Sequence, residues 1–204
     1  TSKDTPDPTG WLQASFFVGL TALADRSDQP AYSSAIVARG VANQWQFGPR
    51  LYHADDHSIG ATYLWAAQHA GVETAIAPLR DPFDRFLKYP PSVDLAHADY
   101  GDPRGVTCAQ RWCWSDAIFM APPVWFELSR RTGDPKYANY AKAELDAVNA
   151  YLYDAAEHLY FRDSRFFDRR GPDGEKVFWS RGNGWALSGL ARSIPLLAEN
   201  DPAR

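Results

Sequence analysis

Apolar residues recur at helical spacing along most of the chain. One such stretch runs from Trp11 to Asp25 and a second from Pro30 to Trp45, with the polar residues 26–29 between them. Proline in the first turn of a helix loses no hydrogen bond, because the first amide groups of a helix have no partner within it. The pattern therefore predicts two helices joined by a short turn.

The same spacing predicts five further helices. They span residues 56–70, 73–87 with a break near Pro82, 116–133, 135–152 and 183–199. The proline- and glycine-rich residues 89–111 predict a long loop, and the polar residues 1–9 a flexible lead-in. Residues 159–179 are aromatic and β-branched with charged turns, which favours a hairpin of two short strands around residues 171–174.

Two of the predicted turns resemble each other. Residues 26–32 and 131–137 each contain a short turn with Asp and Pro, followed by Tyr. Recurrent helix pairs with short links are typical of helical-hairpin toroids, in which each pair buries its apolar face only against its neighbours. A closed toroid of six hairpins needs about twelve helices. Seven helices therefore predict an incomplete all-α toroid.

Composition narrows the class of protein. With 45% hydrophobic and 23% charged residues, the chain has the apolar surface that a globular core needs. A formal charge of −4 without a basic stripe argues against nucleic acid as a partner, and no run approaches the roughly 18 apolar residues of a membrane helix. Cys108 and Cys113 are too few for a disulfide scaffold or a structural zinc site, and are either a local disulfide or two thiols.

Three segments carry polar residues that helix packing does not require. The first, residues 52–60, places Asp55 and Asp56 between His53 and His57 at a predicted helix start. Helix capping is the alternative for Asp55, whereas Asp56 is predicted to be functional. No metal site is expected, because adjacent side chains point apart and no further cluster completes the ligand set.

The second segment, residues 111–123, surrounds the single carboxylate of Asp116 with tryptophans, Trp114 among them, and follows it with a wholly apolar helix turn. Such surroundings exclude water and raise the pKa of a carboxyl group toward the range of a general acid. Capping is again the alternative, but Ser115 is better placed to cap this helix. Asp116 is therefore predicted to take part in chemistry.

The third segment, residues 178–185, places Arg181 and Trp185 around Gly182-Asn183-Gly184. The glycines are predicted to form a backbone turn that sets both side chains at the mouth of the last helix. An arginine fork suits a carboxylate and a tryptophan face suits a sugar ring, so the pair predicts a pocket for an acidic sugar. The alternative is a glycine-rich loop whose arginine pairs with a structural carboxylate.

In this order, the stretches YHADDHSIG, WSDAIFMAPP and FWSRGNGW resemble the unsaturated rhamnogalacturonyl hydrolases of glycoside hydrolase family 105, relatives of the unsaturated glucuronyl hydrolases of family 88. The resemblance covers residues 11–197. It implies an (α/α)6 barrel of which residues 1–204 form a partial catalytic domain, the N-terminal half to two thirds. It also implies that the enzyme needs no metal or organic cofactor.

The resemblance implies a reaction in which a C4=C5 double bond of an unsaturated uronic acid is hydrated, after which the hemiketal falls apart. Asp116 matches the catalytic aspartate, which protonates C4 and then accepts a proton from the water that adds at C5. Asp56 matches the second acidic position, which holds sugar hydroxyls and couples electrostatically to Asp116. Arg181 and Trp185 match the pair that binds the uronate.

Four further residues complete the predicted substrate site. His57 directly follows Asp56, and Trp114 stands two residues before Asp116. Some members of the family have a histidine after a Leu-Tyr-aromatic stretch, where this chain has Arg162 and Asp163. The expected substrate is a small unsaturated uronic acid disaccharide such as unsaturated galacturonyl-rhamnose.

Two other classes of protein share these features. One is another carbohydrate enzyme of the helical-toroid type, an inverting glycosidase or a uronate lyase, and the other is a non-catalytic sugar-binding toroid. The setting of Asp116 favours an enzyme, because a binding site gains nothing from a desolvated acid. An open toroid leaves apolar faces in water, so a second chain or further residues are expected to complete the barrel.

Overall fold

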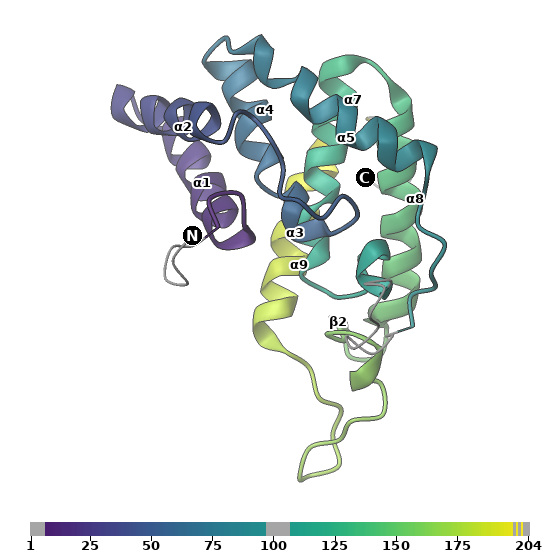
Figure 1. The fold of residues 1–204 in the computed structure, drawn as a ribbon. Coiled ribbons are helices and arrows are strands. Elements are labelled where there is room, and N and C mark those ends of the chain that lie inside the picture. The colour runs from purple at the N-terminus through teal and green to yellow at the C-terminus, as the bar shows by residue number, and fades with distance from the viewer. Residues whose placement is uncertain (1–6, 97–106, 198, 200, 202–204) are drawn as a thin grey trace. The chain divides into compact units, whose positions relative to one another are not determined.

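Helices dominate the computed structural model, which describes residues 7–96, 107–197, 199 and 201 (Figure 1). The chain divides into two compact units, residues 1–51 with 55–89 and residues 52–54 with 90–204. One two-stranded ladder is the only sheet among the described residues. The fold is therefore all-α, as the hydrophobic spacing predicts.

The first unit is built around a pair of helices and a third that packs on both. Its elements are α1 (Trp11–Ala24), α2 (Pro30–Ala42), α3 (Ala54–His57), which starts at the unit boundary, α4 (Gly60–His69), η1 (Glu73–Ala75) and α5 (Ala77–Lys88). Phe17, Ile36 and Ala66, one from each of α1, α2 and α4, form a buried apolar cluster. Pro30 occupies the first turn of α2, as predicted.

The second unit contains a helical hairpin and a helix that packs against it. Its elements are η2 (Cys108–Arg111), α6 (Ala117–Met120), α7 (Pro122–Thr132), α8 (Pro135–Leu152), β1 (Tyr153–Asp154), β2 (Leu159–Tyr160), η3 (Ser164–Phe166), α9 (Ser180–Ser193) and η4 (Ile194–Leu196). Gly133 ends α7 with a φ of 69°. Asp134 caps α8 by accepting a hydrogen bond from the Lys136 amide at 3.1 Å. The α8 boundaries agree with the sequence prediction.

Several predicted helix boundaries are wrong. The predicted helix 56–70 is divided into α3 and α4, and the predicted helix 116–133 into α6 and α7. The second break falls before Pro122, which has no amide hydrogen to donate to α6. Pro82, in contrast, does not break α5, because Leu79, Phe83 and Phe86 are buried along one face of the continuous helix.

The predicted strand hairpin is also misplaced. The ladder pairs Tyr153 with Tyr160 and Asp154 with Leu159, and around residues 171–174 there is only one isolated bridge between described residues. The aromatic residues of this region form a cluster instead of alternating along strands. The ring centres of Phe161 and Phe178 lie 4.8 Å apart. Side-chain packing thus replaces the strand pattern that the composition favours.

Candidate active site

Asp116 lies at the start of α6 in the second unit and is 9% exposed. Its carboxylate forms no capping hydrogen bond with the helix. Ser115 is not the predicted helix cap, because its hydroxyl donates to the Asp116 carboxylate at 3.4 Å. Burial raises the pKa of Asp116 and outweighs the Ser115 hydrogen bond and the positive charges of Arg162 and Arg181, which lower it. The carboxyl group is therefore biased toward its protonated form.

The ring of Trp179 makes cation–π contacts with the guanidinium groups of two arginines. The central carbon of the Arg181 guanidinium lies 4.3 Å from the ring centre, and that of Arg162 lies 5.4 Å from it. Arg181 is exposed and the Arg162 side chain is 34% exposed. The positive charges of Arg162 and Arg181 also act on Asp116. The Trp179 ring therefore holds two guanidinium groups near this carboxyl group.

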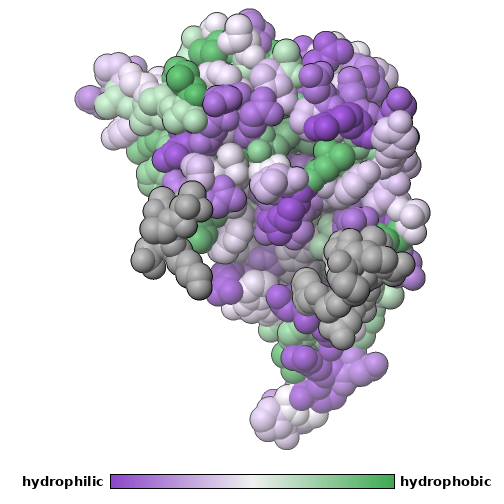
Figure 2. Space-filling model, in the orientation of Figure 1, coloured by the Kyte–Doolittle hydropathy of each residue, from purple (hydrophilic) through white to green (hydrophobic). Residues whose placement is uncertain are grey.

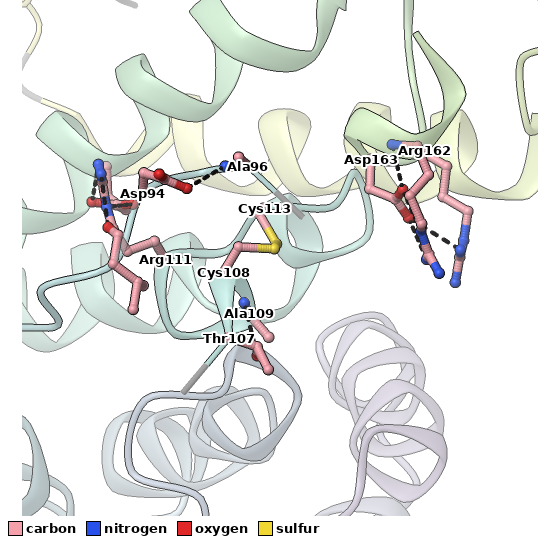
Figure 3. Close-up of a disulfide and its surroundings, with 12 residues drawn as sticks. Asp94, Ala96, Thr107, Cys108, Ala109, Arg111, Cys113, Arg162 and Asp163 are labelled. Carbon is pink, nitrogen blue, oxygen red and sulfur yellow. Dashed lines mark hydrogen bonds and ion pairs between the residues drawn. A yellow bond between two sulfur atoms is a disulfide. The ribbon is translucent and has the colours of Figure 1, made fainter. Parts of the chain in front are cut away.

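Asp163 orients Arg162 from below the surface. Its side chain is 2% exposed and accepts hydrogen bonds from Arg165 Nε and a terminal nitrogen of the same guanidinium, both at 2.8 Å. Arg162 adds one bond at 3.1 Å (Figure 3). Burial alone would raise the pKa of Asp163, but the hydrogen bonds and charges of Arg165 and Arg162 hold it below its usual value. Asp163 is thus ionised and holds the guanidinium groups of Arg162 and Arg165 in place.

Backbone contacts connect these groups. The Ser115 amide donates to the Arg162 carbonyl at 2.9 Å. The Asn183 side chain accepts from the Tyr160 amide at 2.7 Å and donates to the Tyr160 carbonyl at 3.0 Å. Asn183 therefore attaches the strand that leads into Arg162 to the first turn of α9, where Arg181 lies.

Gly182, next to Arg181, serves close packing and not a turn, whereas nothing lies within 4 Å of the Cβ position of Gly184. The sequence prediction is wrong here, because α9 already begins at Ser180 and includes Gly182 and Gly184 in its first turns. A Cβ on Gly182 would lie 2.5 Å from the Ser115 hydroxyl oxygen, and one on Gly189 would lie 2.3 Å from the Ile118 carbonyl oxygen. The missing side chains let α9 approach the segment that carries Asp116.

Two further tryptophans of the predicted site are half-buried. The Trp185 ring lies 4.6 Å from the ring of Phe119, one turn beyond Asp116. The Trp114 ring lies 5.0 Å from that of His53. The second unit thus contains five other residues of the predicted site besides Asp116, of which Arg162 and Arg181 lie close enough to act on its charge. The other three are Trp114, Asp163 and Trp185.

Asp56 belongs to the first unit and has a local partner. Its side chain is 3% exposed and forms an ion pair with Arg50. One carboxylate oxygen accepts from Arg50 Nε at 3.0 Å and from the terminal nitrogen of that guanidinium, and the other accepts from the Arg50 amide at 2.7 Å. Asp55 lies inside α3 and does not cap it. The role of Asp56 toward a sugar stays a prediction.

His57 lies among aromatic side chains of the first unit and is 1% exposed. Its ring centre is 5.0 Å from that of Phe83 and 5.9 Å from that of Phe86. Nε2 lies 2.7 Å from the Leu51 carbonyl oxygen, which a ring N–H at this position satisfies. Burial lowers the pKa of His57 to about 4, against the opposite effects of this hydrogen bond and of Asp56. A neutral ring of this kind positions the α3 segment, and its binding to substrate stays a prediction.

Sequence reasoning missed Trp179 and Asn183. Both stand in the FWSRGNGW stretch, but an aromatic platform cannot be told from a core residue without its neighbours, and Asn183 appeared to belong to a turn. Among the described residues, no group of three His, Cys, Asp or Glu side chains could hold a metal ion. No helix of the described chain has the length and apolar character to cross a membrane.

The model of Glycosyl Hydrolase Family 88 matches residues 2–204. The chain belongs to this family. The match agrees with the sequence motifs, which resemble family 105 and its relative, family 88. A solved structure described as a glycosyl hydrolase family 88 from Bacteroides vulgatus has the same fold, with a TM-score of 0.80 at 22% identity over 96% of this chain and 57% of that chain.

Two curated relatives of this chain carry the same name. An unsaturated 3S-rhamnoglycuronyl hydrolase of Alteromonas sp. (strain LOR) is 42% identical over 202 residues, which are 95% of this chain and 48% of that protein. The protein of that name from Formosa agariphila is 32% identical over 190 residues, 90% of this chain and 50% of that protein. The chain spans about half the length of the curated relatives it matches.

Proposed function

We propose that this family 88 chain carries the acid–base group of a glycoside hydrolase that acts on unsaturated uronyl saccharides linked to rhamnose. The observation that supports this most directly is the buried carboxyl group of Asp116, whose pKa is raised by desolvation while two arginines lie close enough to act on its charge. A carboxyl group with a raised pKa next to two guanidinium forks suits an anionic sugar that must receive a proton. Both named relatives act, by name, on a rhamnoglycuronyl substrate.

In the proposed reaction, the Arg181 fork binds the uronate carboxylate and Asp116 delivers its proton to C4 of the double bond. The positive charge that develops at C5 is shared with the ring oxygen, and water adds there while the Asp116 carboxylate accepts one of its protons. The resulting hemiketal opens and releases the second sugar. A single carboxyl group acts as acid and then as base, so the separation rule for paired glycosidase carboxylates does not apply.

The reaction class can be tested by absorbance near 235 nm, which reports the conjugated double bond. We expect the protein to remove the absorbance of an unsaturated galacturonyl-rhamnose or glucuronyl-rhamnose disaccharide. An increase in absorbance from an intact acidic polysaccharide would indicate a lyase instead. Binding without any change in absorbance would indicate a non-catalytic sugar-binding protein.

A further inference from the structure

One side-chain amide takes the place of a neighbouring strand along β2. The oxygen of the Asn183 side chain accepts from the Tyr160 amide at 2.7 Å, and its nitrogen donates to the Tyr160 carbonyl at 3.0 Å. The next amide along the chain, that of Phe161, donates instead to the Leu152 carbonyl at 2.9 Å. Neighbouring strands exchange one hydrogen bond in each direction in the same way, so Asn183 binds the backbone of β2 at Tyr160.

The same amide holds the residue whose ring contacts both arginines. Asn183 Nδ2 donates a second hydrogen bond to the Trp179 carbonyl at 3.1 Å, and the Asn183 backbone amide donates to the same oxygen, also at 3.1 Å. Both N–H donors of the side chain are therefore in use. Because the Trp179 ring contacts the guanidinium groups of Arg162 and Arg181, Asn183 fixes the backbone from which this ring projects.

The backbone that follows Tyr160 leads to the acid. Arg162 lies two residues after Tyr160, and its carbonyl accepts from the Ser115 amide at 2.9 Å. Ser115 directly precedes Asp116, and its hydroxyl donates to the Asp116 carboxylate at 3.4 Å. A shift of the backbone at Tyr160 would therefore move the charge of Arg162 and disturb the residue before Asp116.

We propose that Asn183 is a positioning residue for the two guanidinium groups near Asp116. It holds Arg162 through the backbone at Tyr160, and it holds the Trp179 ring that both arginines contact. Within the described part of the chain, its side-chain hydrogen bonds go only to backbone groups, so it acts on the reaction through the residues that it places. The inference rests on the proposed function, because the groups that Asn183 places are those of that reaction.

Asn183→Ala removes all three side-chain hydrogen bonds and tests this role. We expect KM for an unsaturated uronyl-rhamnose disaccharide to rise by on the order of tenfold, because the uronate would then bind guanidinium groups that are less well oriented. The value of kcat should fall by a smaller factor, since burial still raises the pKa of Asp116. Asn183→Ser is the milder variant and should show the same changes at a smaller size, which keeps the test usable if Asn183→Ala does not fold.

The pKa of Asp116 separates positioning from a general loss of stability. The charges of Arg162 and Arg181 lower this pKa, together with hydrogen bonds from Ser115 and from the Asp116 amide, whereas burial raises it. If both charges move away, the pKa rises. The alkaline limb of kcat/KM, along which Asp116 loses its proton, should therefore shift to higher pH in Asn183→Ala. A carbon-13 NMR titration of the Asp116 carboxyl group should show the same direction without substrate.

Asn149→Ala is the matched control. Asn149 accepts a hydrogen bond from the Tyr160 hydroxyl at 2.8 Å. This variant therefore releases the ring of the same tyrosine and leaves its backbone held by Asn183. We expect a lower melting temperature, with the wild-type KM and the wild-type pKa of Asp116.

Two results would overturn the role of Asn183. One is a folded Asn183→Ala variant in which the pKa of Asp116 is that of the wild type. The other is an equal change of KM and of this pKa in Asn183→Ala and Asn149→Ala, which would indicate a general loosening of the chain. Failure of the proposed function looks different, because the wild type would then leave the absorbance near 235 nm unchanged, while the NMR titration would still report on Asn183.

Discussion

At the scale of single residues, the protonation of Asp116 depends on burial more than on neighbouring charge. Asp116→Asn keeps the size of the side chain and its ability to accept a hydrogen bond from Ser115, but the amide cannot give or take a proton. We expect the rate of absorbance loss near 235 nm to fall by about 10² to 10⁴, with little change in melting temperature. Asp146→Asn, an exposed change on α8, is the control. Near wild-type turnover by Asp116→Asn would contradict the proposed role of Asp116 as acid and base.

Arg181 offers a second test at this scale. A lysine ammonium is a point charge and cannot reproduce the bidentate fork, and it stacks less well than a guanidinium on Trp179. Arg181→Lys should therefore raise KM for unsaturated uronyl disaccharides by roughly tenfold or more, with a smaller effect on kcat. Arg169→Lys is the control and should leave KM unchanged, because Arg169 stacks on Phe166 and is not among the charges that act on Asp116. An unchanged KM in Arg181→Lys would assign this arginine a structural role.

His57 makes stability depend on pH. Its pKa is about 4 in the folded chain against 6.5 in the unfolded chain, so between these values only the unfolded chain binds the proton. The contribution of neutral His57 to the free energy of unfolding is therefore fully present above pH 6.5. It decreases by up to about 3 kcal/mol as the pH falls to about 4. Urea unfolding at several pH values between 7 and 4 measures this decrease in the free energy of unfolding.

Two variants isolate the effect of His57. His57→Gln can still donate to the Leu51 carbonyl but does not titrate, so its free energy of unfolding should change less over this pH range than that of the wild type. His69→Gln, on the exposed end of α4, should retain the wild-type slope. Identical slopes for His57→Gln and the wild type would show that His57 does not titrate as described.

At the scale of elements, a disulfide precedes the segment of Asp116. Cys108 and Cys113 are bonded and are 2% and 4% exposed (Figure 3). Between them, Arg111 pairs with the buried Glu144 of α8, with Nε 2.9 Å from the carboxylate. The disulfide thus closes a short loop that ends three residues before Asp116, and the ion pair of Arg111 connects this loop to α8. The sequence left the state of these cysteines open.

Reduction of this disulfide should destabilise the second unit. Closing a loop of this length stabilises a protein by about 2 kcal/mol in the chain-entropy model. We expect dithiothreitol to lower the urea midpoint and the turnover of the wild type, and to leave a Cys108→Ser, Cys113→Ser double variant unaffected at an already lower midpoint. Equal midpoints for the double variant and the oxidised wild type would show that the bond has no stabilising role.

At the scale of the whole molecule, α1 presents an apolar stripe to solvent. Leu12, Phe16 and Leu23 are 58%, 63% and 46% exposed, and nothing lies within 4 Å of the Cβ position of Gly19 between them. Figure 2 shows hydrophobic residues interspersed with hydrophilic ones over the face in view. A stripe of this kind on a helix is typical of a surface that another helix covers. Completion of the barrel by further residues or by a second chain stays a prediction.

This stripe should make the 204-residue chain associate. Leu12→Gln combined with Phe16→Gln should reduce binding of a hydrophobic dye and shift the chain toward monomer in light scattering. Its stability should change by less than about 1 kcal/mol, because these side chains are exposed. Val41→Gln, which removes one exposed apolar residue from α2, should not change the association state. A wild-type chain that is monomeric and binds no dye would contradict the prediction.

The sequence by itself determined the features that depend on local spacing and on residue order. Apolar periodicity with proline and glycine signals located α1, α2 and α8 closely, because these helices are specified by residues near one another in the chain. The apolar neighbours of Asp116 predicted its raised pKa. The order of three motifs indicated the family.

Only the tertiary structure decided how the site is assembled. The stacking of Arg162 on Trp179, and the attachment of Tyr160 by Asn183, are contacts between residues far apart in the chain that no local pattern encodes. The same holds for Gly182 of α9, which looks like part of a turn in sequence but is needed because Ser115 occupies the space of its side chain. Packing between elements, and not propensity within them, places the acid next to its two arginines.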